Sequence, residues 1–294
     1  MEDYIVRAVT DAGSVRAFAA ATTGMVNEAH RIHQTWPIAS AALGRLLTAA
    51  AMMGWMLKSE QESLTLQITG DGPIGRVIAV ADSQAHVKGY VGDPFVDLPN
   101  NQAGKLNVGG AVGQNGFLTV IRDLGLKEPY IGRVPLVSGE IGEDLTHYFA
   151  LSEQIPSSVG LGVLVNPDLT IQASGGFLVQ VMPEATDNDI SRLESNINKI
   201  QSVTAMIEKG MTPEDILAVV LEGLPYEITG KTKTAYYCDC SRERVERALV
   251  SLGEKELQKM IIEDGKAELT CHFCDKVYQF DRTELESLLS SAKS

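Results

Sequence analysis

The sequence predicts an α+β protein in which an N-terminal, mostly antiparallel sheet domain with buried helices is followed by a helical connector and a small cysteine-containing domain. Three observations support this prediction. Short β-like stretches follow one another in blocks, which favours antiparallel meanders over a strictly alternating fold. One long apolar stretch has the composition of a buried helix. The cysteines all lie near the end of the chain, at Cys238, Cys240, Cys271 and Cys274.

Composition and charge limit the classes of partner. The chain has 294 residues, 44% of them hydrophobic, so it can bury a substantial core. With 25 Lys+Arg against 38 Asp+Glu, its net charge of −13 disfavours nucleic acid and anionic membranes as partners. The uncharged apolar stretch 46–57 has 12 residues, whereas a bilayer span needs about 20. The acidic N-terminus does not resemble an export signal, so we expect a cytoplasmic, reducing environment.

The N-terminal domain is predicted to begin with a hairpin. Residues 4–10 and 15–20 have strand composition and are joined by the turn-forming sequence Asp-Ala-Gly-Ser. Helices are expected over 25–33 and 35–58, where Pro37 suits an early helical position. The second helix is apolar almost all round and should lie under a sheet. A further helix is expected over 143–154, and further strands over 63–69, 76–81, 86–91, 117–122, 130–137, 159–166 and 170–180.

A helical connector is expected after this domain. A helix beginning at residues 187–189 carries apolar residues in steps of three and four and ends at Gly210; a second runs from Thr212 toward Gly223. We expect both apolar stripes to pack on the preceding domain in the resting protein. The first stripe is Ile190, Leu193, Ile197, Ile200, Val203 and Ile207. The predicted domains are therefore 1–183, 184–230 and 231–294.

Several motifs carry competing interpretations. Residues 70–75 match GxGxxG, but Pro73 and the alternating stretch that follows predict a hairpin and no nucleotide site. His30 and His33, three residues apart, fit an ordinary amphipathic helix better than a metal site.

Acidic residues and a histidine share the predicted helix 143–154 and could form an acid/base group. No candidate nucleophile accompanies them, so we interpret them as a solvated helix face. They are Glu143, Asp144, His147 and Glu153. No catalytic residue is therefore assigned, and we expect a protein that is not an enzyme.

The cysteine cluster gives a strong signal. The pairs Cys238/Cys240 and Cys271/Cys274 are separated by 30 residues, and a folded segment can bring two such chelating pairs together as the tetrahedral S₄ site that Zn²⁺ accepts. His272 could replace one thiolate, but the spacing favours four cysteines. We predict one Zn²⁺ per chain in the reduced form, since four thiolates close the shell.

The ordinary interpretation of a zinc domain of this kind is a static structural ribbon in a zinc-ribbon enzyme or regulator. Residues 231–294 carry 11 Lys+Arg and 12 Asp+Glu, so they offer no basic stripe for nucleic acid.

The chain resembles the redox-regulated heat-shock chaperones of 33 kDa, a bacterial family whose C-terminal signature is CxC followed by CxxC. That signature is present at Cys238-Asp-Cys240 and Cys271-His-Phe-Cys274. The resemblance extends over essentially the whole chain. Further matching segments are 43–45, 64–67, 70–73, 87–91, 143–145, 148–149, 152–154 and 175–180.

The resemblance implies an ATP-independent holdase that is inactive when reduced and zinc-bound. Under oxidants with heat, such a protein forms two disulfides between near neighbours, releases zinc and binds unfolding client proteins, as a homodimer when activated. The implied zinc ligands and redox-active residues are Cys238, Cys240, Cys271 and Cys274. We expect Cys238 to pair with Cys240 and Cys271 with Cys274, because each pair stays close whatever the intervening segment does.

Overall fold

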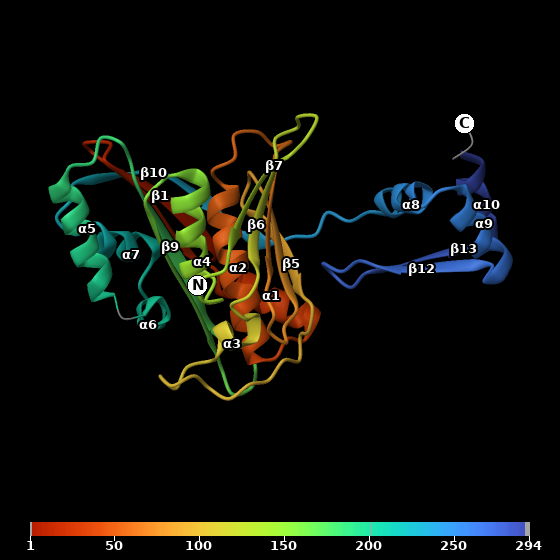
Figure 1. Ribbon diagram of the computed structural model, residues 1–294, viewed down its shortest axis with the longest axis horizontal. Helices are drawn as coiled ribbons and strands as arrows, with labels where there is room; N and C mark the ends of the chain where they lie inside the picture. Colours follow the sequence, from red (N-terminus) through yellow and green to blue (C-terminus); the bar gives the residue numbers. More distant parts are fainter. Residues whose placement is uncertain (1, 201, 292–294) are drawn as a thin grey trace. The chain divides into compact units, whose positions relative to one another are not determined.

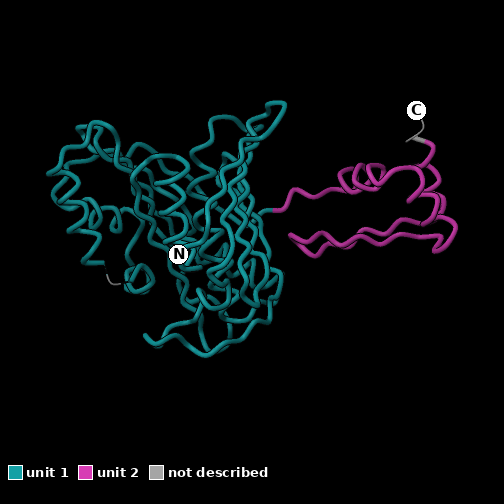
Figure 2. The backbone as a smooth tube through the Cα atoms, in the orientation of Figure 1, with its two compact units in different colours: residues 1–237 teal, residues 238–294 magenta. Residues whose placement is uncertain are grey.

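The computed structural model describes residues 2–200 and 202–291, so the predicted domain ends at residues 1 and 292–294 lie outside the described residues. The chain divides into a large unit, residues 1–237, and a small unit, residues 238–294 (Figure 2). The helices of the predicted connector lie within the large unit. The small unit begins at Cys238 and contains all four cysteines.

The large unit contains two sheets (Figure 1). The first, sheet A, is antiparallel with the order β10-β1-β2-β9-β8. Its strands are β1 (Tyr4–Thr10), β2 (Val15–Ala21), β8 (Ser157–Val165), β9 (Ile171–Val181) and β10 (Tyr226–Lys233). Alternate residues of β1 face opposite sides, with Ile5 in one apolar cluster and Tyr4 and Val6 in another, so this sheet is buried on both faces.

The second, sheet B, has the order β11-β5-β4-β3-β6-β7 and is antiparallel except for the parallel pair β11 and β5. Residues 70–75 connect β3 to β4, and Thr69 pairs with Arg76, so the predicted hairpin is confirmed. Gly75 takes a φ of +72° in this turn, a conformation that glycine adopts readily. The strands are β3 (Ser63–Thr69), β4 (Arg76–Asp82), β5 (His86–Val91), β6 (Phe117–Asp123), β7 (Tyr130–Pro135) and β11 (Ala235–Tyr236).

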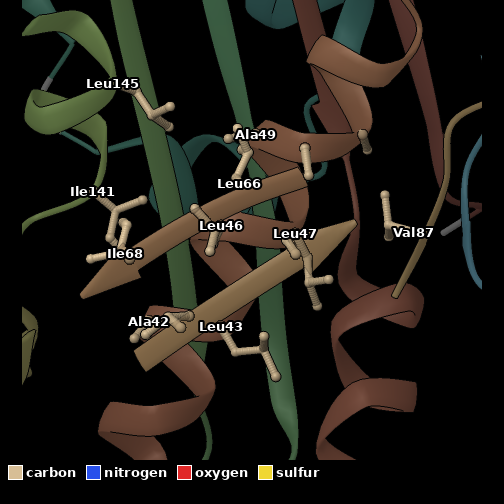
Figure 3. Packing of buried hydrophobic residues seen from close by; sticks show 14 of the residues in the cluster. Ala42, Leu43, Leu46, Leu47, Ala49, Leu66, Ile68, Val87, Ile141 and Leu145 are labelled. Atoms are coloured by element: carbon tan, nitrogen blue, oxygen red, sulfur yellow. The ribbon is translucent and has the colours of Figure 1, made fainter. Parts of the chain in front are cut away.

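Helix α2 (Pro37–Gly54) forms the centre of the large unit and contacts strands of both sheets. Its side chains gather with those of β3, β5 and the region of α4, as Figure 3 shows. Among the described helices it alone is long and apolar enough to cross a membrane, but 89% of that window is buried inside the protein. A Cβ at Gly44 would lie 2.6 Å from Val26 Cγ1, so this glycine permits the close approach of α2 to α1 (Thr23–His33).

Three helices, α5 (Asp187–Lys199), α6 (Val203–Glu208) and α7 (Pro213–Val220), cover the other face of sheet A. The prediction of one continuous helix to Gly210 is wrong, because Ile200 has an extended backbone and Ser202 starts a new helix by accepting a hydrogen bond from the Ala205 N–H. The predicted stripe nevertheless packs on the sheet. Its buried members are Leu193, Val203 and Ile207, and its partly buried members include Ile197 and Ile200.

The remaining elements of the large unit are short. They are α3 (Val108–Val112), α4 (Gly142–Tyr148) and the π-helical turn η1 (Phe149–Glu153). The small unit contains three helices and one hairpin in its described residues. Its elements are α8 (Arg242–Ser251), α9 (Glu254–Glu263), β12 (Lys266–Thr270), β13 (Val277–Asp281) and α10 (Arg282–Ser291).

Candidate metal centre

The first cysteine pair lies at the entry to the small unit. Cys238 and Cys240 precede α8, whose start is fixed by the Ser241 hydroxyl accepting a hydrogen bond from the Arg244 N–H. The Cys240 N–H donates to the Cys238 sulfur. The two sulfurs of this segment therefore lie close together just before the start of α8.

The second pair lies in the turn of the β12–β13 hairpin. Thr270 pairs with Val277, so the turn between them carries Cys271 and Cys274. The Cys271 carbonyl accepts hydrogen bonds from the N–H groups of Cys274 (3.3 Å) and Asp275 (2.8 Å). Asp275 has a φ of +57°, and the Lys276 N–H donates to the Cys274 sulfur. This compact turn presents both sulfurs on one side, as the i, i+3 spacing predicts.

The four sulfurs converge. The Sγ atoms of Cys238, Cys240, Cys271 and Cys274 all lie within 4.8 Å of one another. The Sγ–Sγ distance is 3.3 Å between Cys240 and Cys274 and 3.7 Å between Cys238 and Cys271. In a tetrahedral site with Zn–S bonds of about 2.3 Å, neighbouring sulfurs lie about 3.8 Å apart. The cluster therefore has the size and the donor set of a structural zinc site.

Burial and mutual hydrogen bonds control how readily the thiols of the cluster ionise. Burial raises the pKa of the Cys238 thiol above its usual range, and burial raises the pKa of Cys274 to about 11. Burial acts in the same direction on Cys240, but hydrogen bonds from Tyr278 and the neighbouring thiols outweigh it and lower the Cys240 pKa to about 7. The thiols lie too close together to ionise together without a positive charge between them.

Sequence reasoning missed one residue of this site, Tyr278. It lies on β13 with its ring in the small apolar core, and its hydroxyl donates a hydrogen bond to Cys240 Sγ at 3.1 Å. The signal was present in the sequence, because Tyr278 and Phe280 alternate on one side of a strand that directly follows the second cysteine pair. His272, the alternative ligand, is not part of the group that could hold a metal among the described residues.

The acidic group on the predicted helix 143–154 is only in part a solvated face. Asp144 is fully buried and its carboxylate accepts hydrogen bonds from the N–H groups of Val137 and Ile141, so the prediction of a solvated position is wrong for it. Glu153 accepts a hydrogen bond from the buried Tyr148 hydroxyl and pairs with Arg122. These carboxylates stabilise the loop before α4 and the packing of η1.

The two histidines of α1 do not come together as ligands. His30 Nδ1 lies 3.0 Å from the Thr35 carbonyl oxygen, and His33 Nε2 lies 3.1 Å from the Tyr236 hydroxyl. Within residues 2–200 and 202–291, the four cysteines form the one group of three or more His, Cys, Asp or Glu residues whose ligand atoms lie close enough to hold a metal ion.

Comparison with known proteins decides the family. Residues 3–281 match the family model described as Hsp33 protein. The chain belongs to the Hsp33 family. A relative named 33 kDa chaperonin from Geobacillus kaustophilus is 52% identical over 293 residues, covering 100% of this chain and 99% of the relative. A 33 kDa chaperonin from Bacillus subtilis is 51% identical, covering 97% and 98%.

A solved structure agrees with this assignment. The crystal structure of the 33 kDa chaperonin (heat shock protein 33 homolog) from Thermotoga maritima aligns with a TM-score of 0.89 at 40% identity, covering 99% of both chains. The predicted α+β fold and the predicted family are therefore confirmed. Membership of the Hsp33 family supports a chaperone role, and the four clustered cysteines could bind a metal ion.

Proposed function

We propose that this protein is an ATP-independent holdase of the cytoplasm that is inactive while Cys238, Cys240, Cys271 and Cys274 are reduced and bind one Zn²⁺. Oxidants with heat convert these cysteines to disulfides, release the zinc and activate the protein. The observation that carries this proposal is the convergence of four sulfurs within 4.8 Å in a unit whose core is very small. Partners would be unfolded or partly folded client proteins and, in the active form, a second copy of the chain.

The small unit depends on its sulfurs for stability. Its buried apolar side chains are Leu249, Leu257, Ile261, Tyr278, Phe280 and Leu285. A unit of this size rarely obtains more than about 3–5 kcal/mol from its core. When bound, Zn²⁺ supplies a binding free energy of roughly 10–16 kcal/mol in comparable peptides, which is also folding free energy. The bonds between Zn²⁺ and the four thiolates would thus contribute more to the stability of this unit than its apolar core does.

Oxidation removes this contribution. A thiolate attacks peroxide, an S–O bond forms, the O–O bond breaks and hydroxide leaves; the second thiolate of the pair then attacks the sulfenic sulfur, forming the disulfide and expelling a second hydroxide. Two peroxides thus account for two disulfides. The two disulfides leave no thiolate to bind Zn²⁺, so the oxidised product no longer supports the zinc-dependent fold.

The pairing we propose joins Cys238 to Cys240 and Cys271 to Cys274. The two short Sγ–Sγ distances of the assembled site run between the pairs, but all vertices of a tetrahedron lie close together and do not select a partner. Once the small unit unfolds, loop-closure entropy favours near neighbours. The Cys238–Cys240 bond closes the smaller ring, so it should form later and be reduced more easily. Peptide mapping that finds mainly Cys240–Cys274 links would contradict this pairing.

The connector helices cover an apolar surface of sheet A that a client could bind once it is exposed. Helices α6 and α7 are short, and isolated helices of this length are marginal in water, so their fold depends on sheet A. Their buried residues, with Leu193 of α5, cover apolar residues of β1, β2 and β9. Release of these helices would expose a broad apolar surface to clients. We propose that this release follows loss of the zinc-dependent fold.

The test is an aggregation assay with a heat-denatured client and no ATP. Reduced, zinc-loaded protein should contain one zinc per chain, resist alkylation of its cysteines and leave the client unprotected. Protein treated with peroxide at raised temperature should release its zinc and keep the client in solution. If zinc and fold both survive that treatment, the zinc is a static structural element and the zinc-ribbon alternative holds.

A further inference from the structure

Tyr278 has a position that the packing of a small core does not explain by itself. It pairs with Leu269 across the β12–β13 hairpin and is 5% exposed, two residues before Phe280, which is also buried. A phenylalanine would fill the same place in the core. The hydroxyl group instead reaches the metal cluster, where it lies 3.1 Å from Cys240 Sγ. A buried tyrosine hydroxyl needs a hydrogen-bond partner, and here the partner is a sulfur.

The hydrogen bonds to the sulfurs differ among the cysteines. Cys238 Sγ accepts from the Cys240 backbone N–H, and Cys274 Sγ accepts from the Lys276 backbone N–H. For Cys240 the donor outside the cysteine cluster, among the described residues, is the Tyr278 hydroxyl. A side chain therefore provides at Cys240 what the backbone provides at Cys238 and Cys274. Unlike a backbone N–H, this donor can be removed by substitution.

We propose that Tyr278 is a positioning residue of the metal centre, whose hydroxyl holds the Cys240 thiolate toward the metal and lowers its reactivity with peroxide. This inference rests on the proposed zinc site. Groups that hydrogen-bond to metal ligands orient them, and their loss typically lowers metal affinity about 10–100-fold. A donor to a metal-bound thiolate also withdraws electron density from sulfur, and the attack on peroxide requires that electron pair.

According to this proposal, Tyr278 slows the reaction of Cys240 with peroxide. In the zinc-loaded protein Cys240 is already a thiolate, so the hydrogen bond does not change how much thiolate is present. It changes only how strongly that sulfur attacks the O–O bond of peroxide, the step in which hydroxide leaves and a sulfenic acid forms. Removing the hydroxyl should therefore speed oxidation at Cys240 and weaken zinc retention at the same time.

The test is Tyr278→Phe in the full-length chain, which keeps the ring in the core. Zinc affinity, measured by competition with a chromophoric chelator, should fall about 10-fold. Peroxide should release zinc several-fold faster. In the Co²⁺-substituted protein, the sulfur-to-cobalt charge-transfer band should move to lower energy, because an unshielded thiolate gives up its electron more readily. If the Tyr278 hydroxyl had no influence on the Cys240 sulfur, its removal would not move this band.

Two controls make the result decisive. Tyr237→Phe removes the hydroxyl of an exposed side chain directly before Cys238; among the described residues the tyrosine that donates to a cysteine sulfur is Tyr278, so this variant should match the unmodified protein. Fluorotyrosine at position 278 is a stronger donor of almost the same size and should move the band to higher energy. The inference is overturned if zinc affinity, release rate and band position of Tyr278→Phe equal those of the unmodified protein while that protein binds zinc and releases it on oxidation. If the unmodified protein binds no zinc or retains it on oxidation, the proposed function itself fails.

Discussion

The large unit and the small unit are stabilised by different means. In the large unit, α2 lies against strands of both sheets, and Leu46, Leu47 and Leu66 are fully buried in a continuous apolar core. In the small unit, one hairpin and its helices enclose only a few buried side chains. The sulfurs of its four cysteines lie within 4.8 Å of one another. We therefore expect a chemical change at sulfur to unfold the small unit while α2 and the apolar core around it stay folded.

The largest expected effect separates the two units by metal removal. A strong chelator under reducing conditions should unfold residues 238–294, because it removes the roughly 10–16 kcal/mol that a bound structural zinc contributes. Proteolysis should then cut throughout the small unit. Both tryptophans, Trp36 and Trp55, lie in the large unit, so their fluorescence should not change. A chelated protein that still resists proteolysis after Tyr237 would show that the small core suffices.

The next effect concerns what the small unit restrains. A chain ending at Tyr237 lacks the small unit but keeps β10 and β11, and it should suppress client aggregation and bind an apolar dye with no oxidant. A chain ending at Gly230 also loses part of β10 and all of β11, which exposes edges of β1 and β5, so it should bind more dye. Truncated chains that fold normally, bind no dye and protect no client would rule out a restraining role.

A core substitution in each unit should have a smaller effect than truncation. The substitution in the large unit should change its unfolding free energy, and the one in the small unit should change the rate of zinc loss. Leu46→Ala in the large unit should lower its unfolding free energy by about 2–5 kcal/mol, read from tryptophan fluorescence during denaturation, without changing zinc release. Leu257→Ala in the small unit, where Leu257 is also fully buried, should leave that fluorescence transition in place and speed zinc loss to a chelator. Equal effects of both substitutions on zinc release would show that the units unfold together.

The smallest effect is a pH dependence in the connector. Hydrogen bonds from the backbone and side chain of Thr186 lower the pKa of Asp189, and those of Thr212 lower the pKa of Asp215 in the same way. Because these folded-state pKa values lie below the unfolded value of about 3.9, the stabilisation is complete above that value and is lost as the pH falls through the folded pKa. The protection of amides at the start of α5 and α7, relative to their exchange in an unfolded chain at the same pH, should therefore fall only in acid. Asp189→Asn should remove the pH dependence in α5 alone.

The extent of sequence-based prediction differs between the two units. In the large unit, alternation and turn residues predicted most strands to within two residues, since each strand buries at least one face. Strands β10 and β11 were missed, because β10 is an edge strand with several exposed residues and β11 has two residues, so neither has a strong pattern. The break at Ile200 was also missed, since one apolar stripe runs on through both helices.

In the small unit, the cysteine spacing predicted the convergence of the sulfurs but not the surrounding fold. No strand or helix was predicted there, since short elements around a small core carry weak periodicity. Tyr278 was missed because its role depends on the register of the β12–β13 hairpin, which places it at the cluster. The solvated position predicted for Asp144 was wrong because the N–H groups that donate to its carboxylate come from a loop whose path the sequence does not specify.

The most direct test of the central claim is amide hydrogen exchange of the full-length chain, measured by mass spectrometry before and after peroxide treatment at raised temperature. We expect residues 238–291 to lose protection together with zinc, α5–α7 to lose protection with them, and α2 and β3 to keep theirs. Retained protection across residues 238–291 after all four cysteines are oxidised would contradict the account, because the fold of the small unit would then not depend on its thiolates.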